Sequence, residues 1–192
     1  MLPKFNNVLV VCPGEAKTVG LEALHQLVSK LNNSGQPSSI VYFPFKKNYK
    51  TIPAYLGYSC PIAYYQDIEG DLIIFPKIIT TYATKVKNAS AGIWWMSVNN
   101  FTCIRHANPL RDKVRYIKNL FKGLRPLGGV SSLKNITHFA QSFYAVDFLK
   151  KYDIKGSLLQ DPIPFYLEKS HLNYLKDNLK VSNRKNYLIY SK

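Results

Sequence analysis

The stretch Val8–Leu31, VLVVCPGEAKTVGLEALHQLVSKL, decides the fold class because it runs from a buried strand through a loop into a helix. Residues 8–12 form a short, continuously apolar run, which is typical of a strand buried on both faces of a parallel sheet. Residues 13–20 form the loop, and the Asn-Ser-Gly at residues 33–35 ends the helix. One face of that helix carries the apolar residues Leu21, Leu24, Leu27, Val28 and Leu31. A strand, a loop and an amphipathic helix make up the repeating unit of doubly wound α/β domains.

The same alternation continues along the chain. Apolar runs predict further strands, and a second helix with one apolar face follows one of them. Residues 44–62 contain three prolines and are expected to be irregular. The strands are expected at residues 39–43, 71–76, 91–97, 136–141 and 156–160, and the helix at residues 143–152. We therefore predict an α/β fold, a Rossmann-like three-layer α/β/α domain with a mostly parallel sheet.

Length and composition favour one domain. The chain has 192 residues, of which 46% are hydrophobic, so it can bury one sizeable core. No apolar run in the sequence approaches the roughly 20 residues that a membrane-spanning helix needs, and the apolar run near the amino end is too short for a secretory signal. Cys12, Cys60 and Cys103 are far apart and are interpreted as reduced thiols. We expect a cytoplasmic protein.

The positive charge is concentrated in the middle of the chain. The net charge is +15, and residues 72–146 alone carry 11 basic groups and 1 acidic group. Such a field attracts nucleic acid, anionic lipid or phosphorylated ligands, and it is also compatible with a lysine-rich surface that serves solubility. Lysine outnumbers arginine by 21 to 5, which disfavours nucleic acid because arginine supplies most paired contacts to bases and phosphates.

Part of this charge falls on a predicted helix, residues 110–124. Its apolar residues occupy one arc of about 120°, and its basic residues Arg111, Arg115, Lys118 and Lys122 cluster within about 60°. The apolar residues are Leu110, Val114, Ile117, Leu120, Phe121 and Leu124. Two interpretations stay open. The helix binds an anionic membrane surface, or it is an ordinary surface helix that packs its apolar side on the sheet.

Polar residues follow several of the predicted strands, at the edge where ligands bind in wound sheets. The stretch Ile93–Asn100, IWWMSVNN, ends a strand with two tryptophans and continues into small polar groups. The two rings are interpreted as core, one on each face of the sheet. Five polar residues are predicted to line a ligand crevice at this edge: Ser97, Asn99, Asn100, Gln141 and Ser142.

The first loop is the candidate for binding phosphate. A glycine near a helix amino terminus lets backbone N–H groups approach an anion, and Gly20 with its neighbour Val19 is placed to do so. Gly20 is equally explained as a residue that relieves the turn. The sequence has neither G-x-G-x-x-G nor G-x-x-x-x-G-K-[ST], which disfavours a dinucleotide site and a P-loop.

Metal binding and nucleophilic catalysis have little support in the sequence. Asp67, Glu69 and Asp71 could hold a hard cation, but a solvated turn explains them more simply. The histidines have no metal-ligand spacing, and His138, within a predicted strand, is interpreted as a core residue. We predict no metal site and no cofactor.

Several segments in this order resemble the amino-terminal domain of bacterial GT-B glycosyltransferases, enzymes of surface-polysaccharide assembly with two facing Rossmann-like domains. The likeness spans most of residues 8–165. The segments are VLVVCPG, VGLEALHQLVSKL, DLIIFPKI, IWWMSVNNF and HFAQSFYAVDFLKKYDI. Its most specific pieces are Leu24-His-Gln-Leu27, the Trp-Trp-x-Ser-Val strand and Gln141-Ser-x-Tyr-Ala145.

The resemblance implies a function. In that family the amino-terminal domain mainly holds the acceptor, and the carboxyl-terminal domain mainly binds the nucleotide-sugar donor. It implies a first domain at residues 1–182, and residues 183–192 then look like the start of a second, truncated domain. Gly20 and Val19 would face the donor phosphates, and the five polar residues of the ligand crevice would line the acceptor side. The acceptor would be a sugar or lipid-linked glycan at the inner membrane surface. The nucleotide sugar would be a substrate, and this chain alone would transfer no sugar.

The sequence departs from the family pattern at three places. Val19 stands where a glycine is expected, Lys77 where an acidic residue usually follows the proline, and Asn99 where an aspartate is frequent. No catalytic residue can therefore be assigned. The alternative interpretations are a non-catalytic module that binds glycan or anionic lipid, and one subunit of a split transferase.

Overall fold

The computed structural model describes residues 5–14, 17–45, 49–98, 114, 117, 118, 121, 124 and 129–159. All of them belong to one compact unit, Met1–Pro162. The predicted boundary between residues 182 and 183 lies outside the described residues.

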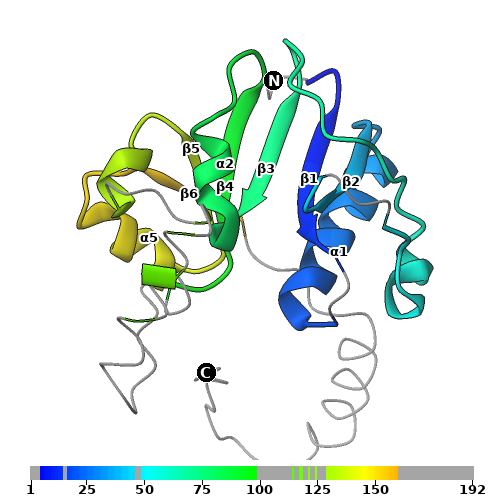
Figure 1. Ribbon diagram of the computed structural model, residues 1–192, viewed down its shortest axis with the longest axis horizontal. Helices are drawn as coiled ribbons and strands as arrows, with labels where there is room; N and C mark the ends of the chain where they lie inside the picture. Colours follow the sequence, from blue (N-terminus) through cyan, green and yellow to red (C-terminus); the bar gives the residue numbers. More distant parts are fainter. Residues whose placement is uncertain are drawn as a thin grey trace, which may run out of the picture. The chain divides into compact units, whose positions relative to one another are not determined.

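Six parallel strands form one sheet in the order β2-β1-β3-β4-β5-β6, as Figure 1 shows. Every neighbouring pair in this order is parallel. The strands are β1 (Val8–Pro13), β2 (Ser38–Phe43), β3 (Leu72–Pro76), β4 (Ser90–Trp95), β5 (Thr137–Ala140) and β6 (Gly156–Leu158). Each coincides with a predicted strand to within two residues at either end. The predicted Rossmann-like α/β fold is confirmed.

A short piece of chain extends the sheet beyond β2. Ile40 forms an isolated parallel bridge with Ile62. The Ile40 N–H donates to the Pro61 carbonyl over 2.8 Å, and the Ala63 N–H donates to the Ile40 carbonyl over 2.9 Å. Counted as a rudimentary strand, residues 61–63 lie outside β2, and the chain then follows the doubly wound Rossmann order, in which the strand sequence reverses beside β1.

Helices cover both faces of the sheet (Figure 1). One face packs against α1 (Val19–Asn33) and the 3-10 helix η1 (Pro53–Tyr58), with Leu24, Val28 and Tyr55 in its core. The other face packs against residues of four elements, with Ile79, Leu133 and Leu149 in its core. These elements are η2 (Lys77–Ile79), α2 (Thr80–Ala83), η3 (Gly129–Leu133) and α5 (Phe143–Lys150). We call these layers the α1 face and the α5 face.

The two tryptophans of β4 point to opposite faces, as predicted. Trp94 belongs to the core of the α1 face and Trp95 to that of the α5 face, and both are fully buried. Consecutive side chains of a strand alternate between the faces, so adjacent large rings fill both cores at one level. Each indole N–H has an acceptor: Trp94 donates to the Leu159 carbonyl over 3.1 Å, and Trp95 to Nδ1 of His138 over 2.8 Å.

The carboxylates ahead of β3 stabilise turns. Asp67 accepts hydrogen bonds from the N–H groups of Lys87, Asn88 and Ala89 at 2.7 to 3.0 Å, and these bonds lower its pKa. Asp71 is buried and accepts from the Asn7 N–H over 3.0 Å. Within the described ranges, no group of three or more potential metal-ligating side chains is found. The structural interpretation of these carboxylates is therefore favoured over a cation site.

In the part of the chain that the structure describes, no helix combines the length and the apolar character needed to cross a membrane.

Candidate functional site

The candidate site lies at the carboxyl edge of the sheet, between β1 and β3. The connection after β1 leads to β2 on one side of it, and β3, β4, β5 and β6 follow on the other. Two loops that leave such a pair of strands in opposite directions open a crevice between them, which is where wound α/β domains bind ligands. The segments that gather at this edge are those after β1, β3, β4 and β5.

The amino terminus of α1 faces this edge and is held firmly. Thr18 is its N-cap residue, and its Oγ1 accepts from the Leu21 N–H over 3.3 Å. The buried Tyr55 hydroxyl contacts Thr18 twice: it accepts from the Thr18 N–H over 2.9 Å and donates to the Thr18 carbonyl over 3.0 Å. The N–H groups of Val19 and Gly20 are among those that a helix leaves without an acceptor in its own backbone. This end of α1 therefore presents a fixed, partly positive group of donors.

A second tyrosine of η1 fixes the next turn of α1. The Tyr58 hydroxyl donates to Oε1 of Glu22 over 2.7 Å and accepts from Nε2 of Gln26 over 3.1 Å. Tyr55 and Tyr58 are three residues apart, so they project from the same side of a 3-10 helix. The analysis of the sequence missed both residues. Pro53 at the first turn of η1, followed by two tyrosines at this spacing, was the available signal.

The structure brings Gly20 next to the segment that follows the tryptophans. A Cβ atom built on Gly20 would lie 3.9 Å from Sδ of Met96, the first residue after β4. Val19 is 48% exposed, so the first turn of α1 is reached by solvent. Residues separated by more than 70 positions in the chain thus lie at one place, as the predicted convergence of strand ends requires.

Lys77 connects the loops after β3 and β4. Its side chain is buried, and its Nζ donates to the carbonyl oxygen of Ser97. A buried ammonium group is tolerated only when it is hydrogen-bonded, so this contact fixes the position of both loops. Ser97 itself is half-buried. The residue that departs from the family pattern therefore holds the predicted acceptor-side segment in place.

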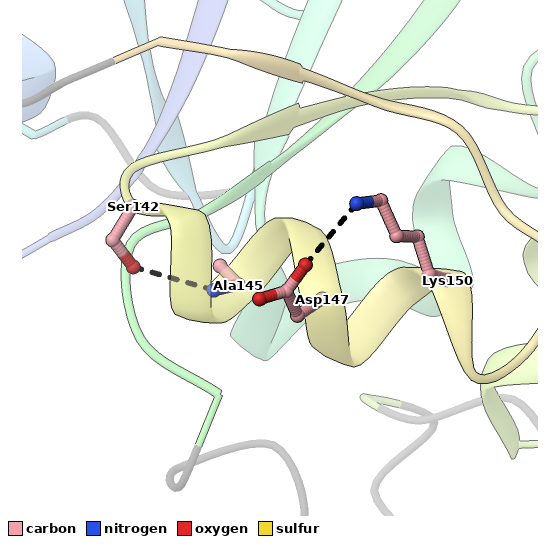
Figure 2. A network of polar contacts seen from close by, with 4 residues as sticks. All are labelled: Ser142, Ala145, Asp147 and Lys150. Atoms are coloured by element: carbon pink, nitrogen blue, oxygen red, sulfur yellow. Dashed lines mark hydrogen bonds and ion pairs between the residues drawn. The ribbon is translucent and has the colours of Figure 1, made fainter.

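The segment after β5 joins the same edge. The backbone N–H of Gln141 donates to the carbonyl of Trp95 over 3.1 Å. Ser142 is exposed and is the N-cap residue of α5, because its Oγ accepts from the Ala145 N–H over 3.3 Å (Figure 2). One turn later, Lys150 and Asp147 form an exposed ion pair of 3.2 Å, also drawn in Figure 2. The hydroxyl of Ser142 thus has a structural role, and its proton is still able to reach a ligand oxygen.

A buried histidine stabilises the α1 face behind this edge. Nδ1 of His25 lies 2.8 Å from the Leu21 carbonyl, so Nδ1 carries the proton. Its Nε2 lies 3.0 Å from the Tyr42 hydroxyl, which is 3.2 Å from Oγ1 of Thr51, and its ring stacks on Tyr55 at 4.4 Å. Burial lowers the pKa of His25, so the ring is neutral at physiological pH. We call these residues the tyrosine network.

The thiols near this edge are not nucleophiles. Burial raises the pKa of Cys12, at the end of β1, to about 12, and that of Cys60 to about 11. Both groups therefore stay protonated at neutral pH, where a reactive cysteine needs a thiolate. The site offers backbone donors, hydroxyls and an amide instead, which suits binding of a polar ligand by hydrogen bonds.

Several predicted site residues lie outside the described residues: Asn99, Asn100, Arg111, Arg115 and Lys122. Lys118 is described and exposed. Three residues of the predicted apolar helix face are also exposed, Val114 at 47%, Ile117 at 49% and Phe121 at 89%. Leu124, from the same predicted face, is partly buried and packs against the core of the α5 face.

No protein-family model matches the chain, and neither the curated proteins nor the solved structures gave a match.

Proposed function

We propose that this domain holds the acceptor in a nucleotide-sugar-dependent glycosyltransferase of polysaccharide or lipopolysaccharide biosynthesis. A second Rossmann-like domain would bind the donor across a cleft. An acceptor hydroxyl would attack the anomeric carbon of the donor sugar, and a nucleoside diphosphate would leave. The role of this domain is to position the acceptor, with the first turn of α1 directed toward the donor phosphates.

One observation carries the proposal: the first turn of α1 lies next to the segment after β4, and the segment after β5 is bonded to the end of β4. Gly20 lies against Met96, and Gln141 is bonded to the end of the Trp-Trp strand. These contacts join three of the segments on which the sequence resembles the acceptor domains of GT-B enzymes, including its most specific pieces. The resemblance supports the chemistry, and the contacts support the existence of a common site.

The site is suited to hydroxyl-rich ligands. Ser97, Gln141 and Ser142 supply side chains that both donate and accept hydrogen bonds. Lys77 fixes the loop that carries Ser97, and Tyr55 fixes the N-cap of α1. A preformed set of such groups loses little entropy on binding, which is the usual requirement for a weak but selective sugar site. In this proposal Lys77 is a positioning residue.

The test is acceptor binding followed residue by residue. We expect neutral oligosaccharides to shift the amide resonances of Gly20, Ser97 and Gln141 in ¹⁵N-labelled protein, and Gln141→Ala to weaken that binding. Asn135→Ala is the matched control, because Asn135 is exposed and precedes β5, at the opposite edge of the sheet. We expect it to bind like the unchanged protein.

Two results would overturn the proposal. Oligosaccharide shifts confined to the edge that contains Asn135 would place binding away from the crevice. Turnover of a nucleotide sugar by the 192-residue chain alone would show that no separate donor domain is needed.

A second candidate, an anionic-lipid-binding module, is favoured by the exposed side chains of Val114, Ile117 and Phe121 beside Lys118. An exposed apolar face bordered by lysine suits a membrane interface. Flotation with anionic and neutral liposomes tests it, and Phe121→Ser should reduce binding to anionic vesicles. Equal binding of the variant and the parent chain would exclude this face as the membrane contact.

A further inference from the structure

A cavity lies beside β2, on the outer edge of the sheet, and none of the predicted site residues lines it. Its volume is about 250 Å³. We call it the β2 pocket. Its lining residues are Val41, Tyr42, Phe45, Tyr49, Ile62, Ala63, Tyr64 and Tyr65. Five of these eight are aromatic, and none carries a charge at neutral pH.

The walls of the β2 pocket come from both layers of the domain. Tyr42 and Tyr49 pack with the core of the α1 face, and Phe45 and Tyr65 pack with that of the α5 face. Phe45 and Tyr65 stack on each other at 4.3 Å, while Tyr49 is tilted by 53° to Tyr42. The stacked and tilted rings are already fixed against the sheet, and Tyr64, 73% exposed, borders the opening. The aromatic walls of the pocket are therefore preformed.

The lining selects against ions and favours a neutral ring with hydroxyls. None of the eight described lining residues offers a charged partner, so against them a phosphate or carboxylate would lose its hydration at a high cost. Burial raises the pKa of Tyr42 and of Tyr65, so both phenols remain neutral hydroxyls. A pyranose has an apolar C–H face that packs on aromatic rings and a rim of hydroxyls that tyrosines can bind. The volume is below the roughly 300–1,000 Å³ of pockets for drug-sized ligands, so one ring is the appropriate size.

The pocket is connected to the crevice through Tyr49. A Cβ atom built on Gly14, in the loop after β1, would lie 2.4 Å from Cε1 of Tyr49, so this ring packs directly on the glycine backbone. Tyr49 thus contacts the loop that leads to α1 and also lines the β2 pocket. The loop after β1 and the β2 pocket therefore lie next to each other, with Tyr49 in contact with both.

We propose that the β2 pocket binds one neutral hexose unit of the acceptor glycan, at a position away from the reacting hydroxyl. This inference rests on the proposed function and deepens it, because it assigns part of acceptor recognition to a second place. A distal unit bound here would add affinity and select glycan length, while the crevice positions the hydroxyl that reacts.

The test uses the 192-residue chain and a panel of methyl hexopyranosides, with nucleosides as the competing ring class. We expect saturation-transfer NMR to show hexoside protons in contact with the protein, and the amides of residues 62–65 to shift. Tyr64→Ala should weaken binding roughly two- to tenfold, the range expected for one aromatic contact. Ile62→Trp, at a 49% exposed position of the lining, should fill the pocket and abolish binding.

Tyr144→Ala is the matched control. Tyr144 is 65% exposed, but α5 follows β5, roughly 19 Å across the sheet from β2 at normal strand spacing. We expect this variant to bind hexosides like the parent chain. A thermal unfolding curve for each variant separates lost binding from lost folding.

Three outcomes would overturn the inference. Hexoside shifts at Gly20, Ser97 and Gln141 without shifts at residues 62–65 would reject the β2 pocket and leave the proposed function standing. Stronger binding of nucleosides than of hexosides would assign the pocket to a base. No binding of any hexoside would reject this subsite, and the oligosaccharide titration of the crevice would then decide the proposed function separately.

Discussion

Among the residues that the structure describes, each face of the sheet buries one histidine, and the two histidines have different surroundings. On the α5 face, Nε2 of His138 donates to the Leu133 carbonyl over 2.9 Å and Nδ1 accepts from Trp95 over 2.8 Å, within an apolar core. On the α1 face, His25 belongs to the tyrosine network, which continues to Tyr55 and so to the N-cap of α1. His138 only bonds groups inside the core of the α5 face, whereas His25 connects the core of the α1 face to the candidate site.

From this difference we infer that the α5 face mainly determines stability, and that the α1 face mainly determines the geometry of the candidate site. A group enclosed among apolar side chains has no substitute partner when its own partner is removed, so its loss is costly. When one group is removed from a network of hydroxyls, its neighbours can rearrange to bond with one another. We therefore expect changes on the α5 face to reduce stability and changes on the α1 face to alter the position of α1.

The same substitution in both histidines gives the largest expected effect. His138→Phe removes the Nδ1 acceptor from the fully buried indole N–H of Trp95, and we expect a loss of roughly 2–4 kcal/mol in the free energy of unfolding. His25→Phe keeps the stacking on Tyr55 and leaves Tyr42 next to Thr51, so roughly 1–2 kcal/mol is expected. Urea denaturation measures both. Equal losses would mean that the two faces do not differ in the proposed way.

Lys77 tests the connection between the loops after β3 and β4. Lys77→Met keeps the apolar stem but removes the donor to the Ser97 carbonyl, and we expect a loss of about 1–3 kcal/mol, as for a hydrogen bond from a charged group. Lys77→Arg keeps the charge and serves as the control for loss of a cation. If Lys77→Met changes neither the stability nor the amide resonance of Ser97, the lysine does not position this segment.

Acid should destabilise the domain through both histidines. Burial lowers the pKa of His25 and of His138 in the folded state, so the unfolded chain binds more protons below its own pKa of about 6.5. The stability that the two neutral histidines contribute is therefore fully present above that pH. It is lost as the pH falls toward the pKa values that the histidines have in the folded state. Denaturation between pH 7.5 and 5.5 should show this loss. The slope should be smaller in His138→Phe, and an unchanged slope would mean that His138 does not titrate in this way.

Much of the fold was predictable because its signals are local. Buried parallel strands are continuous apolar runs, and the adjacent Trp94 and Trp95 had to fill opposite faces once they were placed in a strand. The rudimentary strand at residues 61–63 was not predicted, because a single bridge beside a proline leaves no alternating pattern.

The site was predictable only in part. Parallel strand order places the ends of β1, β4 and β5 together, so Gly20, Ser97 and Gln141 could be assigned to one edge. The contacts that fix this edge depend on folding over long distances: Tyr55 reaches Thr18 across 37 positions, and Lys77 reaches Ser97 across 20. Nothing in the spacing of these residues reveals such pairs. The β2 pocket likewise requires the two layers to meet around β2.

The smallest expected effect concerns two glycines near the loop after β1. At Gly20 an added methyl would make only an ordinary contact with Met96, at 3.9 Å, and alanine favours a helix, so Gly20→Ala should stabilise the domain by up to about 1 kcal/mol. At Gly14 the same methyl would lie 2.4 Å from the Tyr49 ring, so Gly14→Ala should destabilise the domain.

Thermal unfolding compares the stability of the two variants. If Gly20→Ala is more stable yet binds a nucleoside diphosphate or an acceptor less well, the glycine serves the approach of a ligand to α1. If it is destabilised as much as Gly14→Ala, the fold itself requires that space, and Gly20 loses its place in the candidate site.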